Sequence, residues 1–157
     1  EEAAVMAHRL GKKVVLNPAP ASELSSRLLG SLFAITPNET EAEKISGIRI
    51  TDEASAEYAA RRIASMGVRN VIVTLGVRGA LVFDGEHCER IPAYEMQAVD
   101  TTAAGDIFNG AFVVALSEGR SLPEAVRFAC KASAISVTRV GAQSSAPYRT
   151  EVDIFNR

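Results

Sequence analysis

The sequence predicts an α/β protein, a three-layer α/β/α sandwich with a mostly parallel sheet. Short apolar runs alternate with segments of helical periodicity, the order that places helices on both faces of a parallel sheet. The apolar runs at 14–16 and 71–74 show no polar alternation, so we expect buried strands there, with the first buried on both faces. A further short strand is expected at 32–35. Asp84-Gly85 is typical of a tight hairpin and would join two further strands toward one edge, at 80–83 and 86–91.

Helical periodicity and terminal residues predict the helices that connect these strands. Glycine follows several of the apolar patterns, and a glycine after the last turn readily adopts the left-handed conformation that ends a helix. Pro123 suits a helix first turn, where the missing N–H has no intrahelical partner to lose. The predicted helices are 4–10, 22–29, 38–45, 52–66, 105–118, 121–137 and 151–155.

Length and composition narrow the possible functions. A chain of 157 residues forms one domain at most and is long enough to bury a core. The net charge of −2 gives no electrostatic case for binding nucleic acid or an anionic membrane. No apolar run approaches the roughly 18 residues needed to span a bilayer. Cys88 and Cys130 are isolated, which favours a reduced compartment, most simply the cytoplasm.

The N-terminal segment predicts an incomplete sheet. The chain enters a helical pattern at once, and the buried strand at 13–16 follows it directly. A helix in that position normally follows an earlier strand of the same sheet. We therefore expect the N-terminal part of the fold to be absent from this chain.

The segment Asp100-Thr-Thr-Ala-Ala-Gly-Asp106 carries the strongest functional signal. A strand at roughly 89–96 is expected to run into it, and an apolar helical pattern follows it. Free amides and the positive end of the helix dipole favour an anion at such a helix start, and the small residues 103–105 let a phosphate approach the backbone. A Gly-Asp pair alone is usually only a good helix start. The longer string, with Asp106 beside an anion site, indicates phosphoryl transfer to a hydroxyl.

Five motifs in the chain together carry a family resemblance. They are Asn17-Pro-Ala-Pro20, Thr36-Pro-Asn-Glu-Thr-Glu-Ala-Glu43, Thr74-Leu-Gly-Val-Arg-Gly79, Asp100-Thr-Thr-Ala-Ala-Gly-Asp-Ile-Phe-Asn-Gly110 and Val137-Thr-Arg-Val-Gly-Ala-Gln143. In order and in sequence they resemble the ribokinase-like (PfkB) carbohydrate kinases, and the Ala-Ala-Gly-Asp form is most like the ribokinases among them. The resemblance covers almost the whole chain, which corresponds to the C-terminal half of such a kinase. It implies that the absent half holds most of the sugar site and a small β-sheet lid.

This resemblance implies an ATP-dependent sugar kinase. The reaction would transfer the γ-phosphate of ATP to the primary 5-hydroxyl of D-ribose and give ribose 5-phosphate. Asp106 would be the catalytic base, with Ala103, Ala104 and Gly105 at the anion hole. Two alternatives stay open: another acceptor (fructose, a deoxysugar acid or a nucleoside), or a non-catalytic nucleotide-binding fragment. The family also implies a homodimer for the full-length protein.

The resemblance assigns the ATP site to several segments. On its own, the stretch 74–79 is typical of a glycine-rich turn between two strands; the resemblance places it beside ATP, with its glycines allowing close approach. Cys130 stands where ribokinases commonly have Asn near the adenine, although a small buried residue is the simpler interpretation. The implied ATP contacts are Asn38, Thr74, Leu75, Gly76, Val77, Arg78, Gly79, Gly105, Asp106 and Cys130.

The resemblance also implies two cation sites, one for Mg²⁺ and one for potassium. The spacing Asn38-x-x-Glu41 predicts a capping box at a helix start. The resemblance adds a role for both residues in organising Mg²⁺ and the nucleotide phosphates, with Glu41 acting through metal-bound water. It also implies a potassium site formed largely by backbone carbonyls, although turn and capping chemistry alone would account for the same residues. The implied potassium residues are Asp100, Thr102, Ser136, Arg139, Gly141 and Ser145.

Overall fold

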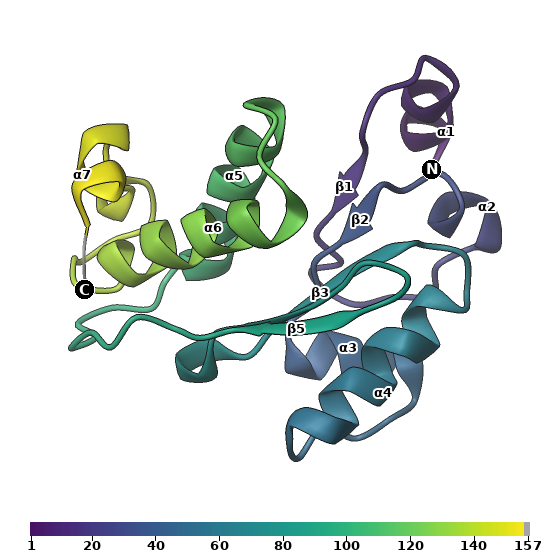
Figure 1. Ribbon diagram of the computed structural model, residues 1–157, viewed down its shortest axis with the longest axis horizontal. Helices are drawn as coiled ribbons and strands as arrows, with labels where there is room; N and C mark the ends of the chain where they lie inside the picture. The colour runs from purple at the N-terminus through teal and green to yellow at the C-terminus, as the bar shows by residue number, and fades with distance from the viewer. Residues whose placement is uncertain (156–157) are drawn as a thin grey trace. The chain divides into compact units, whose positions relative to one another are not determined.

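The computed structural model describes residues 1–155 and divides the chain into two compact units (Figure 1). The first unit comprises Glu1–Leu75 and Leu81–Arg90, and the second comprises Gly76–Ala80 and the chain from Ile91 onward. The sheet lies mainly in the first unit, and the long helices with the predicted anion loop lie in the second.

The sheet has five strands in the order β1-β2-β3-β4-β5. Strands β1, β2 and β3 are parallel, with Val15 opposite Ala34 and Ala34 opposite Asn70. The connections at 75–79 and 84–87 are too short for a parallel crossover, so β4 and β5 extend the sheet as antiparallel neighbours, which confirms the predicted hairpin. The strands are β1 (Val15–Leu16), β2 (Ala34–Ile35), β3 (Asn70–Thr74), β4 (Ala80–Phe83) and β5 (Cys88–Ile91).

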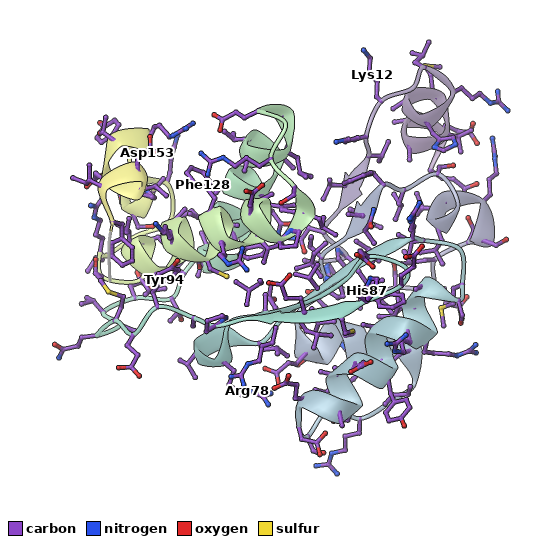
Figure 2. The ribbon with its side chains drawn as sticks, viewed as in Figure 1. Lys12, Arg78, His87, Tyr94, Phe128 and Asp153 are labelled. Atoms are coloured by element: carbon purple, nitrogen blue, oxygen red, sulfur yellow. The ribbon has the colours of Figure 1, made fainter. Side chains whose placement is uncertain are left out.

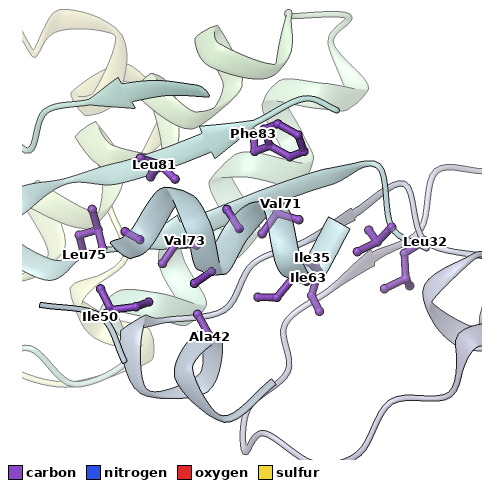
Figure 3. Close-up of a cluster of buried hydrophobic side chains, with 14 of the residues drawn as sticks. Leu32, Ile35, Ala42, Ile50, Ile63, Val71, Val73, Leu75, Leu81 and Phe83 are labelled. Atoms are coloured by element: carbon purple, nitrogen blue, oxygen red, sulfur yellow. The ribbon is translucent and has the colours of Figure 1, made fainter. Parts of the chain in front are cut away.

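Apolar side chains of the strands form the core of the first unit (Figure 3). Ile35 and Val71 on neighbouring strands are fully buried, and so is Ile63 on the helix that covers them. Both faces of β3 are largely buried, as its uninterrupted apolar run predicted, and β4 is buried as well. The same prediction was wrong for β1, whose residues Val15 and Leu16 are only partly buried. Burial of such side chains contributes roughly 1.5–3 kcal/mol each, which makes this cluster the main stabilising element of the unit.

Four helices belong to the first unit. Helix α4 packs on β3 and against α3, and α1 contacts α2. Gly47 ends α3 with φ 73°, the left-handed conformation that the sequence predicted for a helix-ending glycine. The four are α1 (Glu2–Arg9), α2 (Ser26–Leu29), α3 (Glu39–Ser46) and α4 (Glu53–Ala64).

The second unit is mainly helical. Helices α5 (Ala104–Ser117) and α6 (Leu122–Ser136) pack along each other, and α7 (Arg149–Ile154) contacts α6. On α5, the rings of Phe108 and Phe112 stack with their centroids 6.4 Å apart, and Phe112 is fully buried. Two short 3₁₀ turns accompany these helices, η1 (Gly76–Arg78) and η2 (Gln143–Ser145).

Several predicted elements, β2 and α4 among them, are shorter than expected, and two others have a local cause. The strand expected to reach residue 96 ends with β5 at Ile91, because Pro92 has no N–H to donate to a strand ladder, and residues 92–103 form no helix or strand. The helix predicted from residue 22 begins only at Ser26. There the side chain of Ser25 accepts a hydrogen bond from Leu28 N at 3.1 Å and caps the first turn.

Candidate functional site

The start of α5 presents exposed backbone and a carboxylate. Ala103, the N-cap residue of α5, has φ 59° and ψ 12°. This left-handed conformation leads the chain into the first turn of the helix. The methyl group of Ala103 cannot accept a hydrogen bond, so no N-cap side chain covers the first-turn amides. Gly105 and Asp106, both exposed, follow in that turn. The positive end of the helix dipole therefore meets solvent beside a proton acceptor.

Polar contacts fix this first turn from within the second unit. Ser133 on α6 donates its hydroxyl to Ala104 O at 3.2 Å, and Asn109 donates its side-chain amide to Gly105 O at 2.8 Å. The Ala104 amide donates to Thr101 O at 3.2 Å, so it is already engaged by the loop. The sequence did not indicate the supporting roles of Ser133 and Asn109. The spacing of Asn109, four residues after Gly105, offered a signal, whereas Ser133 lies too far along the chain to offer one.

Asp100 joins the loop before α5 to the segment after α6. Its carboxylate accepts hydrogen bonds from Thr102 N at 2.9 Å and from Gly141 N at 2.8 Å. The hydroxyl of Thr102 is the main cause that lowers the pKa of Asp100 to about 2, with the Gly141 and Thr102 amides adding to it. The group is therefore ionised at neutral pH. Val137 O accepts from Val99 N (2.7 Å) and Asp100 N (3.1 Å), which completes the junction.

The segment 136–145 brings oxygen atoms together next to Asp100. Ser136 and Ser145 are buried, and their hydroxyls donate to Ser133 O and Ala142 O, both at 2.8 Å. The potassium residues that the sequence indicated thus lie on the two segments that the Asp100 carboxylate joins. An ionised carboxylate with backbone carbonyls is a donor set that suits an alkali cation. Across residues 1–155, no cluster of three or more His, Cys, Asp or Glu side chains could hold a metal ion.

In the first unit, Asn38 and Glu41 form the predicted capping box of α3. Asn38 Oδ1 accepts from Glu41 N at 2.9 Å, and Glu41 Oε2 accepts from Asn38 N at 2.8 Å. The local structural role is therefore confirmed. The second carboxylate oxygen of Glu41, Oε1, takes no part in this box, so the box is compatible with a hydrogen bond from metal-bound water.

The stretch 74–79 follows β3 and reverses the chain. Thr74 forms an isolated parallel bridge with Asn38, and its amide donates to Pro37 O at 2.9 Å. The carboxyl end of β3 is thereby joined to the start of α3. Beyond it, the η1 turn carries Val77, which is 95% exposed, and Arg78 (Figure 2).

Gly79 follows this turn, and two features require glycine there: the backbone conformation and the lack of space for a side chain. Its φ is 94°, and a Cβ atom there would lie 2.1 Å from Ile91 O and 2.6 Å from Ala93 N. The family resemblance implied that Gly76 and Gly79 let ATP approach this stretch closely. The approach that the structure shows is to the chain's own backbone at 91–93.

Cys130 is a buried residue of α6 with 8% of its surface exposed. Burial raises the pKa of its thiol to about 12, so it remains protonated at neutral pH. The simpler interpretation from the sequence, a small buried side chain, describes these surroundings. Both Cys88 and Cys130 are free thiols.

The structure therefore gathers part of the indicated residues into one group in each unit, and the contacts described above place 76–79 and Cys130 in neither group. Asn38, Glu41 and Thr74 share backbone contacts at the end of β3 in the first unit. The helix start at 103–106 and the segment 136–145 are linked through Asp100 in the second. Chemically, the second group offers an anion-binding helix start, a proton acceptor and an ionised carboxylate among carbonyl oxygens.

Comparison with known proteins identifies the family. The family model of the pfkB carbohydrate kinases matches residues 1–149. The chain belongs to the pfkB family of carbohydrate kinases. Family membership confirms the resemblance on which the functional predictions from the sequence depend.

Individual members of the pfkB family are similar over nearly the whole chain. A ribokinase from Haemophilus influenzae is 52% identical over 151 residues, which cover 96% of this chain and 49% of that protein. The structure of a ribokinase from Thermotoga maritima matches with a TM-score of 0.85 and 43% identity, covering 97% of this chain and 52% of that one. An Arabidopsis thaliana ribokinase complexed with ribose and ATP matches with a TM-score of 0.87 and 34% identity, covering 95% and 49%.

These likenesses confirm the predicted ribokinase-like α/β fold. The chain spans about half the length of the relatives that it matches. In the part of the chain that the structure describes, no helix combines the length and the apolar character required to cross a bilayer.

Proposed function

We propose that the chain is the ATP-binding and catalytic portion of an ATP-dependent sugar kinase whose acceptor is the primary 5-hydroxyl of D-ribose. The observation that carries the proposal is the start of α5, where Asp106 follows an uncapped helix turn with exposed backbone. The 52% identity to a ribokinase favours ribose among the family's acceptors. The product would be ribose 5-phosphate.

In the proposed reaction, Asp106 accepts the proton of the sugar hydroxyl as that oxygen attacks the γ-phosphorus of ATP. The bond between the γ-phosphorus and the bridging oxygen breaks, and ADP leaves with the electron pair. The amides of Gly105 and Asp106 stabilise the charge that develops on the transferring phosphoryl group. Ala104 contributes less, because its amide already donates to Thr101 O. The exposure of Asp106 is compatible with proton transfer to an incoming hydroxyl.

The proposed ATP contacts fall in several segments of the chain. In the first unit they are Asn38, Thr74 and Leu75; in the second they are 76–79, the helix start and the surroundings of Cys130. Asn38 and Glu41 would hold magnesium-bound water, and the ion when bound neutralises the β and γ oxygens. The capping box supports this assignment, because it holds the Glu41 carboxylate in one orientation.

A monovalent cation, potassium, would bind where Asp100 joins the segment 136–145. The oxygen donor set supports this assignment, because an ionised carboxylate and carbonyl groups suit an alkali cation. Its proposed effect is to hold the loop before α5, and with it the orientation of the first-turn amides. Activation by potassium over sodium is the expected result.

Replacement of Asp106 tests the proposal. In the protein extended to the length of its relatives, Asp106→Asn should lower kcat for ribose phosphorylation by roughly 10²–10⁴, the usual range for lost acid–base catalysis. Equilibrium binding of ATP should change far less, because the first-turn amides remain. Asp153→Asn, an exposed change on α7, is the matched control and should keep normal turnover. Near-normal turnover of the Asp106 variant would remove this residue from the role of base.

A non-catalytic nucleotide-binding role for the 157-residue chain by itself is the second candidate. The observation that favours it is the length of the chain, which covers only about half of its relatives. An assay of ATP consumption with ribose, on this chain and on the extended protein, separates the two. Ribose phosphorylation by the short chain alone would exclude this second candidate.

A further inference from the structure

The turn at 136–141 is held from two sides within the second unit. Asp100 holds one side, as described above. On the other side, the guanidinium of Arg139 contacts both carboxylate oxygens of Glu151 on α7: Nη2 pairs with Oε1, and Nη1 lies 3.3 Å from Oε2. This two-pronged geometry fixes the Arg139 side chain far better than a single contact would.

Helix α7, which carries Glu151, is held in place by contacts with the two long helices of the second unit. Val152 anchors it with only 3% of its surface exposed. At its end, Lys131 on α6 donates to Phe155 O at 2.9 Å. Near its start, Arg149 forms an ion pair with Glu118 at the end of α5. The short helix is thus fastened to both long helices of the unit.

The Glu151 carboxylate is itself held in place. Its Oε2 atom also accepts a hydrogen bond from Tyr148 N at 2.7 Å, which closes the first turn of α7. The side chains of Arg139 and Glu151 are both 35% exposed, so the pair is partly shielded from water.

We propose that the Arg139–Glu151 ion pair positions the turn for monovalent-cation binding by keeping the carbonyl groups of Arg139 and Gly141 in a binding-competent arrangement. The inference rests on the proposed function, because it concerns the potassium proposed there. Arg139 is a positioning residue through its side chain, while its own carbonyl is a proposed ligand. Without the pair, the turn would populate other conformations, and apparent cation affinity falls with the fraction of competent molecules.

A simple stabilising role is the alternative, and exposed ion pairs usually contribute little to stability. The two roles differ in what they predict for potassium. A purely structural pair would change the melting temperature equally at every potassium concentration. A positioning pair would change the potassium concentration at which the rise in melting temperature caused by potassium is half complete.

The test measures thermal unfolding of the 157-residue chain against KCl, with choline chloride keeping the ionic strength constant. Bound potassium should raise the melting temperature of the wild-type chain. In Glu151→Gln, the amide oxygen still accepts from Tyr148 N, but the charge pair is lost. The potassium concentration that gives half of the maximal rise in melting temperature should increase about tenfold, as expected when a residue that orients metal ligands is removed. Arg139→Lys keeps the charge without the two-pronged geometry and should give an intermediate shift.

Asp153→Asn is the matched control, because it breaks the ion pair between Arg149 and Asp153 on the same helix (Figure 2). It should leave the half-maximal potassium concentration unchanged. Equal potassium responses in Glu151→Gln, Arg139→Lys and wild type would overturn the inference. A wild-type chain without any potassium response would overturn it together with the proposed cation site. The role of Asp106 would be untouched by either result, because it is tested separately by turnover.

Discussion

Ala103 is the one non-glycine residue with positive φ in the part of the chain that the structure describes. An alanine in this conformation loses roughly 1 kcal/mol relative to glycine, because its Cβ approaches the following carbonyl oxygen. Glycine, which lacks a Cβ atom, adopts this conformation without that strain. The strain lies directly before the helix turn proposed to bind phosphate, which is where strained backbone is often retained.

Ala103→Gly should therefore leave the free energy of unfolding within about 0.5 kcal/mol of wild type, because relief of strain offsets the greater entropy of glycine in the unfolded chain. Ala104→Gly, one residue later and inside α5, should lower it by about 0.5–1 kcal/mol, because no strain is relieved there. Urea unfolding of the two variants measures the difference. Equal losses in both would contradict the strained conformation of Ala103.

The ionisation of Asp100 makes the stability of the folded chain depend on pH in the acid range. The pKa of this carboxyl is lowered in the folded state from its ordinary value of 3.8 to about 2. A lowered folded pKa contributes stability that is present above the unfolded pKa and is lost as the pH falls toward the folded pKa. We expect wild-type stability to fall between pH 4 and pH 2, and Asp100→Asn to show a shallower fall over that range. Urea unfolding at several pH values measures both slopes, and identical slopes would show that the Thr102 and Gly141 contacts do not act on Asp100.

At the scale of elements, the turn between β3 and β4 depends on one glycine. Gly79→Ala should lower the free energy of unfolding by about 2–3 kcal/mol, because positive φ and a collision with backbone at 91–93 act together. Gly76→Ala is the matched control, since Gly76 also has positive φ (55°) but a Cβ atom there would meet no atom within 4 Å, and it should cost only about 1 kcal/mol. Similar losses in both variants, by urea or thermal unfolding, would mean that the close approach of Gly79 is relieved cheaply.

The two ends of α3 were predictable from the sequence. Asn38 and Gly47 bound α3 through local side-chain and backbone chemistry that the sequence displays directly. Strand ends were less predictable, because a strand stops where its ladder stops. The strand before α5 ended early at Pro92, although apolar residues continue beyond it.

At the scale of the whole molecule, the identity of the sugar acceptor is the property that this chain predicts least. We expect the extended protein to phosphorylate ribose with the highest kcat/KM in a panel that includes fructose, a deoxysugar acid and a nucleoside. The physical reason is that a site built to bind each substrate hydroxyl rejects analogues that leave its polar groups unpaired. Initial rates across the panel measure this preference. A higher kcat/KM for any other acceptor would reject ribose as the substrate while keeping the family's chemistry.

The fold was largely predictable from the sequence, because apolar periodicity and turn residues are local signals. For the candidate site, the sequence indicated residues but not the contacts that hold them. Contacts between distant segments, such as Gly141 with Asp100 or Arg139 with Glu151, leave no spacing pattern. The left-handed Ala103 was also hidden, since alanine rarely marks such a conformation. The family motifs indicated candidate residues, and the three-dimensional arrangement was needed to show which contacts support them.

The state of the two cysteines has a practical consequence for spectroscopy. Desolvation raises the pKa of Cys88 to about 11 and that of Cys130 to about 12. Thiols that carry so little thiolate at neutral pH react slowly with maleimides and other alkylating probes. A cysteine introduced at Val77, which is 95% exposed, would be modified first. A fluorophore attached there would test the proposed approach of ATP to this turn, with both native sulfur atoms left in place.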